Sequence, residues 1–219
     1  MICNQIMQTT PLQPDTYKLM EQQLNSLIKE NRYISETVSN KKKDQNSLSS
    51  IVIRQLSQSD CIKLGTGIEK LLVDLILQKS EHSELKDIKP KNEKGSKERD
   101  HLFIRENEKI VYYAELKANL NLDTEKSKST YTKCQFIVDE LKSQYPDYTI
   151  KWCLLGCRYL HSDNIPGLIS KRYTAIQENL FGINQYLQLM NVNLQFTEET
   201  YTEFVNNIAD AMFSEVVEE

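Results

Sequence analysis

Apolar residues recur at helical spacing in several parts of this 219-residue chain. Residues 16–30 illustrate the pattern, with an apolar stripe made of Leu19, Met20, Leu24, Leu27 and Ile28. A broad apolar face also follows Thr66, which is a candidate N-cap residue. The spacing predicts helices over residues 16–30, 51–64, 66–80, 124–144 and 198–213.

A different pattern, rich in β-branched and aromatic residues, covers 100–105 and 110–117 and predicts two strands. The polar residues from Glu106 to Lys109 predict a hairpin turn between them. A nearly continuous apolar run over 149–160 is typical of a strand buried on both faces. The charged segment 81–98 offers only a weak strand, near 85–88. The order helix, strand, strand, helix, strand predicts an α/β domain with a helical crossover into the buried strand.

Composition restricts the class of protein further. Hydrophobic residues make up 39% and charged residues 26% of the chain, as in soluble globular proteins. No apolar run approaches the roughly 18 residues of a membrane span, and we see no signal-peptide pattern. The five cysteines lack CxxC spacing and are expected to be reduced core residues of a cytoplasmic protein. Paired Cys or His ligands for structural zinc are not recognisable.

Charge is distributed unevenly along the chain. The net charge is −4, but residues 192–219 hold seven acidic residues and no Lys or Arg. Residues 1–191 therefore contain 27 basic and 24 acidic residues, a net charge of +3. A nucleic-acid-binding face is compatible with this distribution, although charge alone favours an ordinary solvated surface.

The predicted hairpin contains charged residues that its apolar neighbours do not explain. If the turn is centred on residues 107 and 108, antiparallel partners have numbers that sum to 215, so Asp100 faces Glu115. Directly opposed residues share a face with Cβ atoms roughly 5 Å apart, and two like charges in this position are destabilising. Lys117 projects from the same face as Glu115, because strand side chains alternate.

A divalent cation would explain the opposed carboxylates. Mg²⁺ prefers hard oxygen ligands and is commonly held by one or two carboxylates with waters and phosphate oxygens. The backbone carbonyl of Leu116 is a third candidate ligand beside Asp100 and Glu115. Lys117 is then placed to orient or deprotonate a water molecule, or to stabilise negative charge on a phosphate. A metal ion held in this way beside a lysine suits phosphodiester hydrolysis.

Each residue also has a simpler interpretation. Asp100 could pair with Arg99 or Lys97 at the end of a loop, and Glu115 and Lys117 could lie on a solvated sheet face. Glu69 stands three residues after Thr66, which is the spacing of a helix capping box. The nuclease hypothesis depends on the combination of these residues and on the order of the elements around them.

The motif Arg99-Asp100 … Glu115-Leu116-Lys117 resembles that of the PD-(D/E)XK nuclease superfamily, with Arg99 in place of the usual proline. The resemblance covers about residues 65–160. It implies a restriction-endonuclease-like core, a mixed β-sheet flanked by helices, with helical additions at both ends. It also implies a Mg²⁺ cofactor, a catalytic set of Asp100, Glu115 and Lys117, and a further catalytic role for Glu69 on the preceding helix.

The segment after the motif, residues 117–133, is dense in side chains that contact phosphates and base edges. Asn119, Asn121, Lys126 and Lys128 are therefore candidate DNA contacts. They are equally compatible with a capped, exposed helix. Further candidates outside this segment are Arg158, Lys171 and Arg172.

Residues 115–130 also resemble the HinfI-like type II restriction endonucleases, a group whose members cleave at GANTC. The resemblance implies a bacterial homodimer that cuts double-stranded DNA. In that organisation residues 1–64 form a helical dimerisation or clamp region, 65–160 the nuclease core, and 161–219 a mixed region packed on the core.

Other functions stay open at this point. Another nuclease with the same core, such as a repair or mobile-element enzyme, differs only in how it selects its site. A non-catalytic DNA-binding protein would not bring Asp100, Glu115 and Lys117 together. Metal-independent hydrolysis has little support, because His82, His101 and His161 lack a nucleophile motif and His101 should point away from the face of Asp100.

Overall fold

The computed structural model describes residue 45 and residues 47–80, 85–88 and 99–213. The predicted helix over 16–30, His82 and Lys97 lie outside the described residues. Within the described residues, no helix is both long and apolar enough to cross a membrane.

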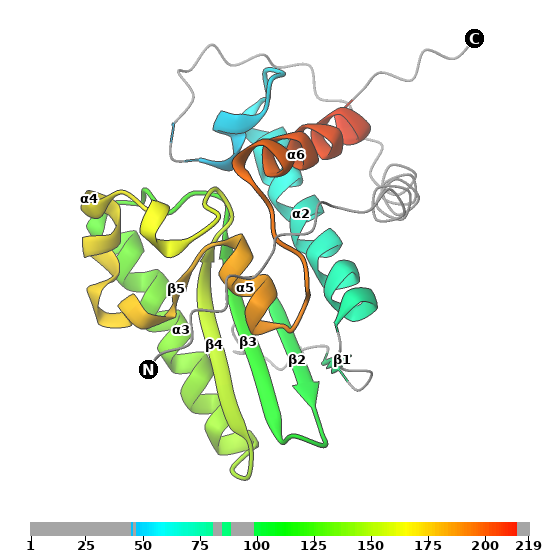
Figure 1. The fold of residues 1–219 in the computed structure, drawn as a ribbon. Helices are drawn as coiled ribbons and strands as arrows, with labels where there is room; N and C mark the ends of the chain where they lie inside the picture. Colours follow the sequence, from blue (N-terminus) through cyan, green and yellow to red (C-terminus); the bar gives the residue numbers. More distant parts are fainter. Residues whose placement is uncertain (1–44, 46, 81–84, 89–98, 214–219) are drawn as a thin grey trace, which may run out of the picture.

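A five-stranded mixed sheet forms the centre of the fold (Figure 1). Its strands are β1 (Leu85–Asp87), β2 (His101–Arg105), β3 (Ile110–Lys117), β4 (Thr149–Gly156) and β5 (Leu180–Phe181), in that spatial order. The first three strands pair antiparallel, and β3, β4 and β5 pair parallel. The sheet confirms the predicted α/β class, and β1 is the weak strand expected near 85–88.

The predicted hairpin register is confirmed. Leu102 pairs with Tyr113 and Ile104 pairs with Val111, so partner numbers sum to 215. The turn runs from Glu106 to Lys109, and Lys109 adopts a φ of 52°. Alternation along the strands therefore sends each residue of β3 to the face expected from the sequence.

Helices cover both faces of the sheet (Figure 1). One face packs against α2 (Gln58–Lys79), α5 (Ile183–Leu189) and α6 (Glu198–Phe213), together with the short helix η1 (Leu48–Ile51). The other face packs against α3 (Thr124–Gln144) and η3 (Lys171–Asn179), with η2 (Ser162–Asn164) and α4 (Gly167–Ser170) in the connection before η3. The bounds of α3 and α6 agree with the predicted helices.

Strand β4 differs from the prediction in one respect. Its second half is buried on both faces, but Thr149 and Lys151 in its first half are exposed. The strand also ends at Gly156 rather than at residue 160. Only the carboxyl half of β4 is therefore enclosed by helices on both sides, and this half lies beside the carboxyl end of β3.

Helix α2 corrects the prediction of two helices with a break near Gly65. Ser57 is the N-cap, and its hydroxyl and the Asp60 carboxylate form a capping box. Thr66 lies inside the helix, where its hydroxyl donates to the carbonyl of Ile62 at 3.3 Å. A Cβ at Gly67 would lie 2.7 Å from the Met212 sulfur, so this glycine allows α6 to approach α2 closely. The capping-box interpretation of Glu69 is therefore wrong.

The expected domain boundary between residues 64 and 65 falls inside α2. Leu48 and Leu64 share a single core with Val205 and Ile208 of α6 and with the residues that β3 and β4 bury on this side. Residues 47–64 and helix α6 are thus parts of one packed unit with the sheet.

Candidate active site

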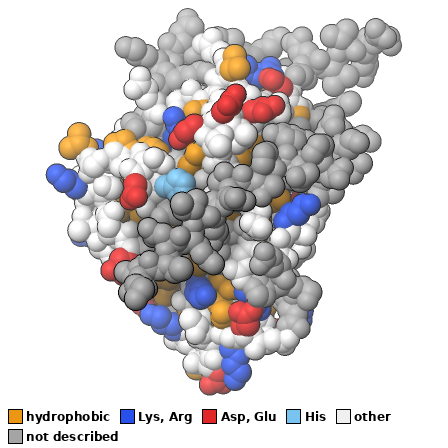
Figure 2. Space-filling view, viewed as in Figure 1, with side chains coloured by type: hydrophobic (Ala, Val, Ile, Leu, Met, Phe, Trp, Pro, Cys, Tyr) orange, Lys and Arg blue, Asp and Glu red, His pale blue; other side chains and the backbone are white. Residues whose placement is uncertain are grey.

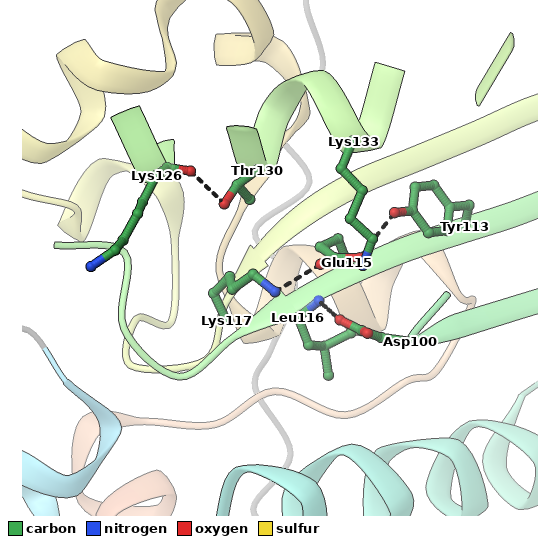
Figure 3. A network of polar contacts seen from close by, with 8 residues as sticks. All are labelled: Asp100, Tyr113, Glu115, Leu116, Lys117, Lys126, Thr130 and Lys133. Atoms are coloured by element: carbon green, nitrogen blue, oxygen red, sulfur yellow. Dashed lines mark hydrogen bonds and ion pairs between the residues drawn. The ribbon is translucent and has the colours of Figure 1, made fainter. Parts of the chain in front are cut away.

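The candidate site lies at the carboxyl end of β3, beside the beginning of β2 and under the first half of α3 (Figure 3). Asp100 directly precedes β2, and Glu115 and Lys117 project from alternate positions of β3. A fourth charged residue, Lys133, reaches into the same place from α3. The open end of the β2–β3 hairpin and helix α3 therefore supply the cluster.

The Asp100 carboxylate accepts a hydrogen bond from the backbone N–H of Leu116 at 2.7 Å. This bond fixes Asp100 across the end of the hairpin, next to Glu115. Burial raises the pKa of Asp100 above its ordinary value, and the negative charge of Glu115 raises it further. The like-charge repulsion predicted from the hairpin register is thus present, and a cation placed between the two carboxylates would relieve it.

The Glu115 carboxylate is buried, with a side-chain exposure of 1%, and donors surround it. Its Oε1 atom accepts from Lys117 Nζ at 2.7 Å and from Lys133 Nζ at 2.8 Å. Its Oε2 atom lies 2.8 Å from Lys133 Nζ and accepts from the Tyr113 hydroxyl at 3.1 Å. These contacts exclude the simpler interpretation of Glu115 as a residue on a solvated sheet face.

Lys117 carries a positive charge at neutral pH. Burial alone would lower the pKa of its ammonium group, but the carboxylates of Glu115 and Asp100 outweigh burial and raise the pKa above its ordinary value. This arrangement suits an ammonium group that orients a water molecule or stabilises negative charge, which are two of the roles predicted for Lys117.

Sequence reasoning missed Lys133 and the polar role of Tyr113. Lys133 stands four residues before Ile137 and directly before Cys134, at the edge of the buried stripe of α3. A lysine at the edge of an otherwise apolar helix face was a usable signal that a buried acid lies opposite. Tyr113 appeared to be a core aromatic residue, and the position of its hydroxyl does not follow from the residue type.

Glu69 lies on α2, on the other side of the sheet. Its backbone carbonyl contacts Nε2 of His101 at 3.1 Å, and Nδ1 of His101 contacts the Tyr186 hydroxyl. Burial raises the pKa of Cys157 to about 12, with smaller contributions from the carboxylates of Asp100 and Glu69. Both acids are thus within electrostatic range of the same thiol. His101 points into the α2 side of the core, as strand alternation predicts.

Three of the predicted DNA contacts belong to one internal network. The Asn119 side chain accepts from the backbone N–H of Asn121 at 2.7 Å. Arg172 donates to the Asn121 side chain at 3.1 Å and to the carbonyl of Leu122. These residues hold the loop between β3 and α3 against η3. The contacts give Asn121 and Arg172 a structural role beside the predicted one.

The remaining predicted contacts lie on the surface or at other junctions. Lys126 and Lys128 are exposed at the beginning of α3, where Lys126 pairs with the N-cap residue Asp123 at 3.2 Å. Lys171 is exposed at the beginning of η3. Arg158 donates to the Ser50 hydroxyl at 3.1 Å and so links the end of β4 to η1. The alternative pairing of Asp100 with Arg99 is not made, because Arg99 contacts Glu140 at 3.5 Å.

Part of the acidic excess of residues 192–219 lies on α6. Figure 2 shows acidic side chains gathered over this helix, on the face that the view presents. The helix contains no Lys or Arg, and its acidic residues are Glu198, Glu199, Glu203 and Asp210. A polyanion would be repelled from this surface and would meet the lysines at the beginning of α3 more favourably.

The side chains at the site fit a magnesium ion better than a zinc ion. Asp100 and Glu115 offer hard carboxylate oxygens from adjoining strands, and Leu116 directs its backbone N–H toward Asp100. The N–H and the carbonyl of one strand residue face the same neighbour, so the Leu116 carbonyl is expected beside Asp100. Over the described ranges, no group of three or more His, Cys, Asp or Glu side chains is arranged to hold a metal. Mg²⁺ accepts a ligand set of two carboxylates completed by a carbonyl and water molecules.

Comparisons with known proteins identify no relative: no protein-family model, no curated protein and no solved structure matches the chain.

Proposed function

We propose that this chain is a Mg²⁺-dependent endonuclease that hydrolyses phosphodiester bonds of double-stranded DNA. The observation that carries the proposal is the convergence of Asp100, Glu115 and Lys117 at the open end of the hairpin, with Asp100 bonded to Leu116. The resemblance of the motif to the PD-(D/E)XK superfamily, and the matching order of elements from α2 to β4, support the same reaction class.

In this proposal each residue has a distinct task. Asp100, Glu115 and the Leu116 carbonyl hold the metal, which when bound polarises the phosphate and makes a bound water more acidic. Lys117 keeps its ammonium group next to Glu115, where it stabilises the negative charge that develops on the phosphate oxygens. Glu69 is a weaker candidate, since it approaches from the α2 side of the sheet.

DNA binding in the proposal uses the surface around the beginning of α3. The exposed residues Lys126 and Lys128 lie in the first turns of α3, the helix that also supplies Lys133 to the candidate site, and the helix N-terminus adds a favourable partial charge for phosphate. The finer proposal is a bacterial type II restriction endonuclease that acts as a homodimer on a short palindromic site such as GANTC. Two-fold symmetry of the protein would then match that of the DNA.

The test is incubation of the purified chain with phage DNA and Mg²⁺, followed by sequencing of the fragment ends. Discrete fragments with one common end sequence support a restriction enzyme, and a smear supports a less selective nuclease. Glu115→Gln should abolish cleavage and leave DNA binding measured without metal largely intact. Glu203→Gln removes an exposed charge on α6 and is the matched control. Cleavage by Glu115→Gln at the wild-type rate would refute the assignment, and intact DNA with the wild-type protein would favour a binding protein.

A further inference from the structure

The donors around Glu115 leave little room for a further ligand. A carboxylate offers about four acceptor positions. Four contacts occupy them here: Lys117 and Lys133 at Oε1, and Lys133 and Tyr113 at Oε2. A metal ion that binds Glu115 must therefore replace one of these donors.

The cluster is also balanced in charge. Asp100 and Glu115 contribute two negative charges, and Lys117 and Lys133 contribute two positive charges. Desolvated ions need such pairing, because an isolated buried charge is costly. A divalent cation added to this cluster would leave it with excess positive charge unless an ammonium group moves away or an anion arrives.

The arrangement of the contacts favours Lys133 over Lys117 as the group that would move, although both side chains are partly exposed. If Lys117 left, Lys133 would still contact both oxygens of Glu115. If Lys133 left, each oxygen would lose one contact, and Lys117 and Tyr113 would still hold the carboxylate in place. Departure of Lys133 alone therefore opens a position on both oxygens without freeing the side chain.

Lys133 projects from α3 (Figure 3), the helix whose first turns expose two of the proposed DNA contacts, Lys126 and Lys128. Its side chain is 24% exposed, whereas the carboxylate that it covers is buried. A rotation of this flexible side chain exchanges one anionic partner, Glu115, for another, a phosphate of the DNA backbone.

We propose that Lys133 is a displaceable counter-ion, which blocks Glu115 in the free protein and releases it to Mg²⁺ when a DNA phosphate takes the ammonium group. This inference rests on the proposed function and assigns Lys133 a positioning and regulatory role in it. Its consequence is reciprocal coupling: DNA increases the affinity of the site for the metal, and the metal increases the affinity for DNA.

Calorimetric titration of the full chain tests the block directly. Without DNA, Lys133→Met should bind Mg²⁺ about tenfold more tightly than the wild type, since a competing cation is gone. Lys142→Met makes the same change in the last turn of α3, near Asp139, and should stay within about threefold of the wild type. Equal or weaker Mg²⁺ binding by Lys133→Met would overturn the proposal.

A second titration tests the coupling, with Ca²⁺ in place of Mg²⁺ to prevent cleavage and a duplex that contains the mapped cleavage site. The duplex should raise the Ca²⁺ affinity of the wild type about tenfold, and that of Lys133→Met by less than about threefold. Lys133→Arg retains the positive charge and should behave like the wild type. Undiminished coupling in Lys133→Met would contradict the proposal.

The two proposals can fail separately. If the wild type cleaves DNA but Lys133→Met shows neither effect, the nuclease assignment stands and the role of Lys133 does not. If the wild type cleaves nothing, the titration without DNA still decides whether Lys133 competes with a cation at Glu115. Urea unfolding verifies that each variant is folded, and Lys133→Gln replaces Lys133→Met if the methionine variant does not fold.

Discussion

The two ends of the β2–β3 hairpin each bury one charged side chain, and the two side chains differ in how completely their polar atoms are hydrogen-bonded. At the open end, Glu115 is surrounded by two ammonium groups and a hydroxyl. At the turn end, Arg105 donates from one nitrogen to the Tyr112 hydroxyl at 2.8 Å and to Glu108 at 3.4 Å, and its guanidinium group lies over the Tyr112 ring. Its Nε and Nη2 atoms have no hydrogen-bond partner in the described structure.

This difference distinguishes the proposed site at the open end of the hairpin from the structural contact at its turn end. The partners of Glu115 are two ammonium groups and a hydroxyl that come from β3 and α3, and our proposal is that a metal and a phosphate exchange with one of them. The partners of Arg105 all belong to the same hairpin, so the arginine mainly fastens the turn. A buried charge with exchangeable partners is the more promising place for chemistry.

Removal of each charge gives the largest contrast in stability. Glu115→Ala leaves two ammonium groups without their shared carboxylate and should lower the free energy of unfolding by about 3–5 kcal/mol. Arg105→Met replaces an incompletely bonded cation by an apolar side chain and should change that free energy by less than about 1 kcal/mol. Urea unfolding measures both. Equal losses for the two variants would show that the ends of the hairpin do not differ in this way.

Lys117→Met should separate function from stability at the open end. The carboxylate of Glu115 keeps Lys133 and Tyr113, so the fold should survive, but the charge that stabilises the reacting phosphate is lost. The cleavage rate at saturating DNA and Mg²⁺ should fall about 10²- to 10³-fold, with DNA affinity little changed. Lys142→Met serves again as the control. A Lys117→Met protein with full activity would remove this residue from the mechanism.

His101 makes stability depend on pH from within the α2-side core. Burial lowers its pKa from 6.5 to about 4. Between these values the unfolded chain binds a proton that the folded chain does not, so stability is fully present above pH 6.5 and is lost as the pH falls toward 4. The loss should approach about 3 kcal/mol.

Unfolding titrations at a series of pH values measure the dependence on His101. His101→Gln should flatten the curve between pH 6.5 and 4. An unchanged slope in His101→Gln would assign the acid sensitivity to other groups.

The smallest expected effect concerns the hydrogen bond between Arg172 and Asn121 near the site. Asn121→Ala removes the side chain that Arg172 holds and should cost about 1 kcal/mol of stability. Thermal unfolding measures the loss, and DNA affinity measured in parallel shows whether Asn121 also contacts DNA. A loss of DNA affinity without any loss of stability would restore the original prediction of a direct contact.

Local patterns predicted the hairpin well, because strand alternation and one short turn determine its register. The weak strand near 85–88 and helices α3 and α6 were also predicted correctly, because local residue patterns are sufficient to identify them. The break predicted at Gly65 was wrong because the glycine at position 67 serves the tertiary contact with Met212 and not a helix end.

The trio proposed to be catalytic was predictable from its register, but its environment was not. Lys133 meets Glu115 only through the packing of α3 on the sheet, and sequence spacing does not report the distance between those elements. The role of Arg172 likewise depends on a contact between η3 and the loop after β3. The residue pattern therefore did not predict these contacts between separate elements.

A crystal structure of the protein with bound Mn²⁺ and a DNA duplex tests the central claim most directly. We predict an anomalous difference peak about 2.2 Å from carboxylate oxygens of both Asp100 and Glu115, with Lys133 turned to a phosphate. A duplex seated on the protein without a metal peak at these carboxylates, and with the contact between Lys133 and Glu115 intact, would contradict the account.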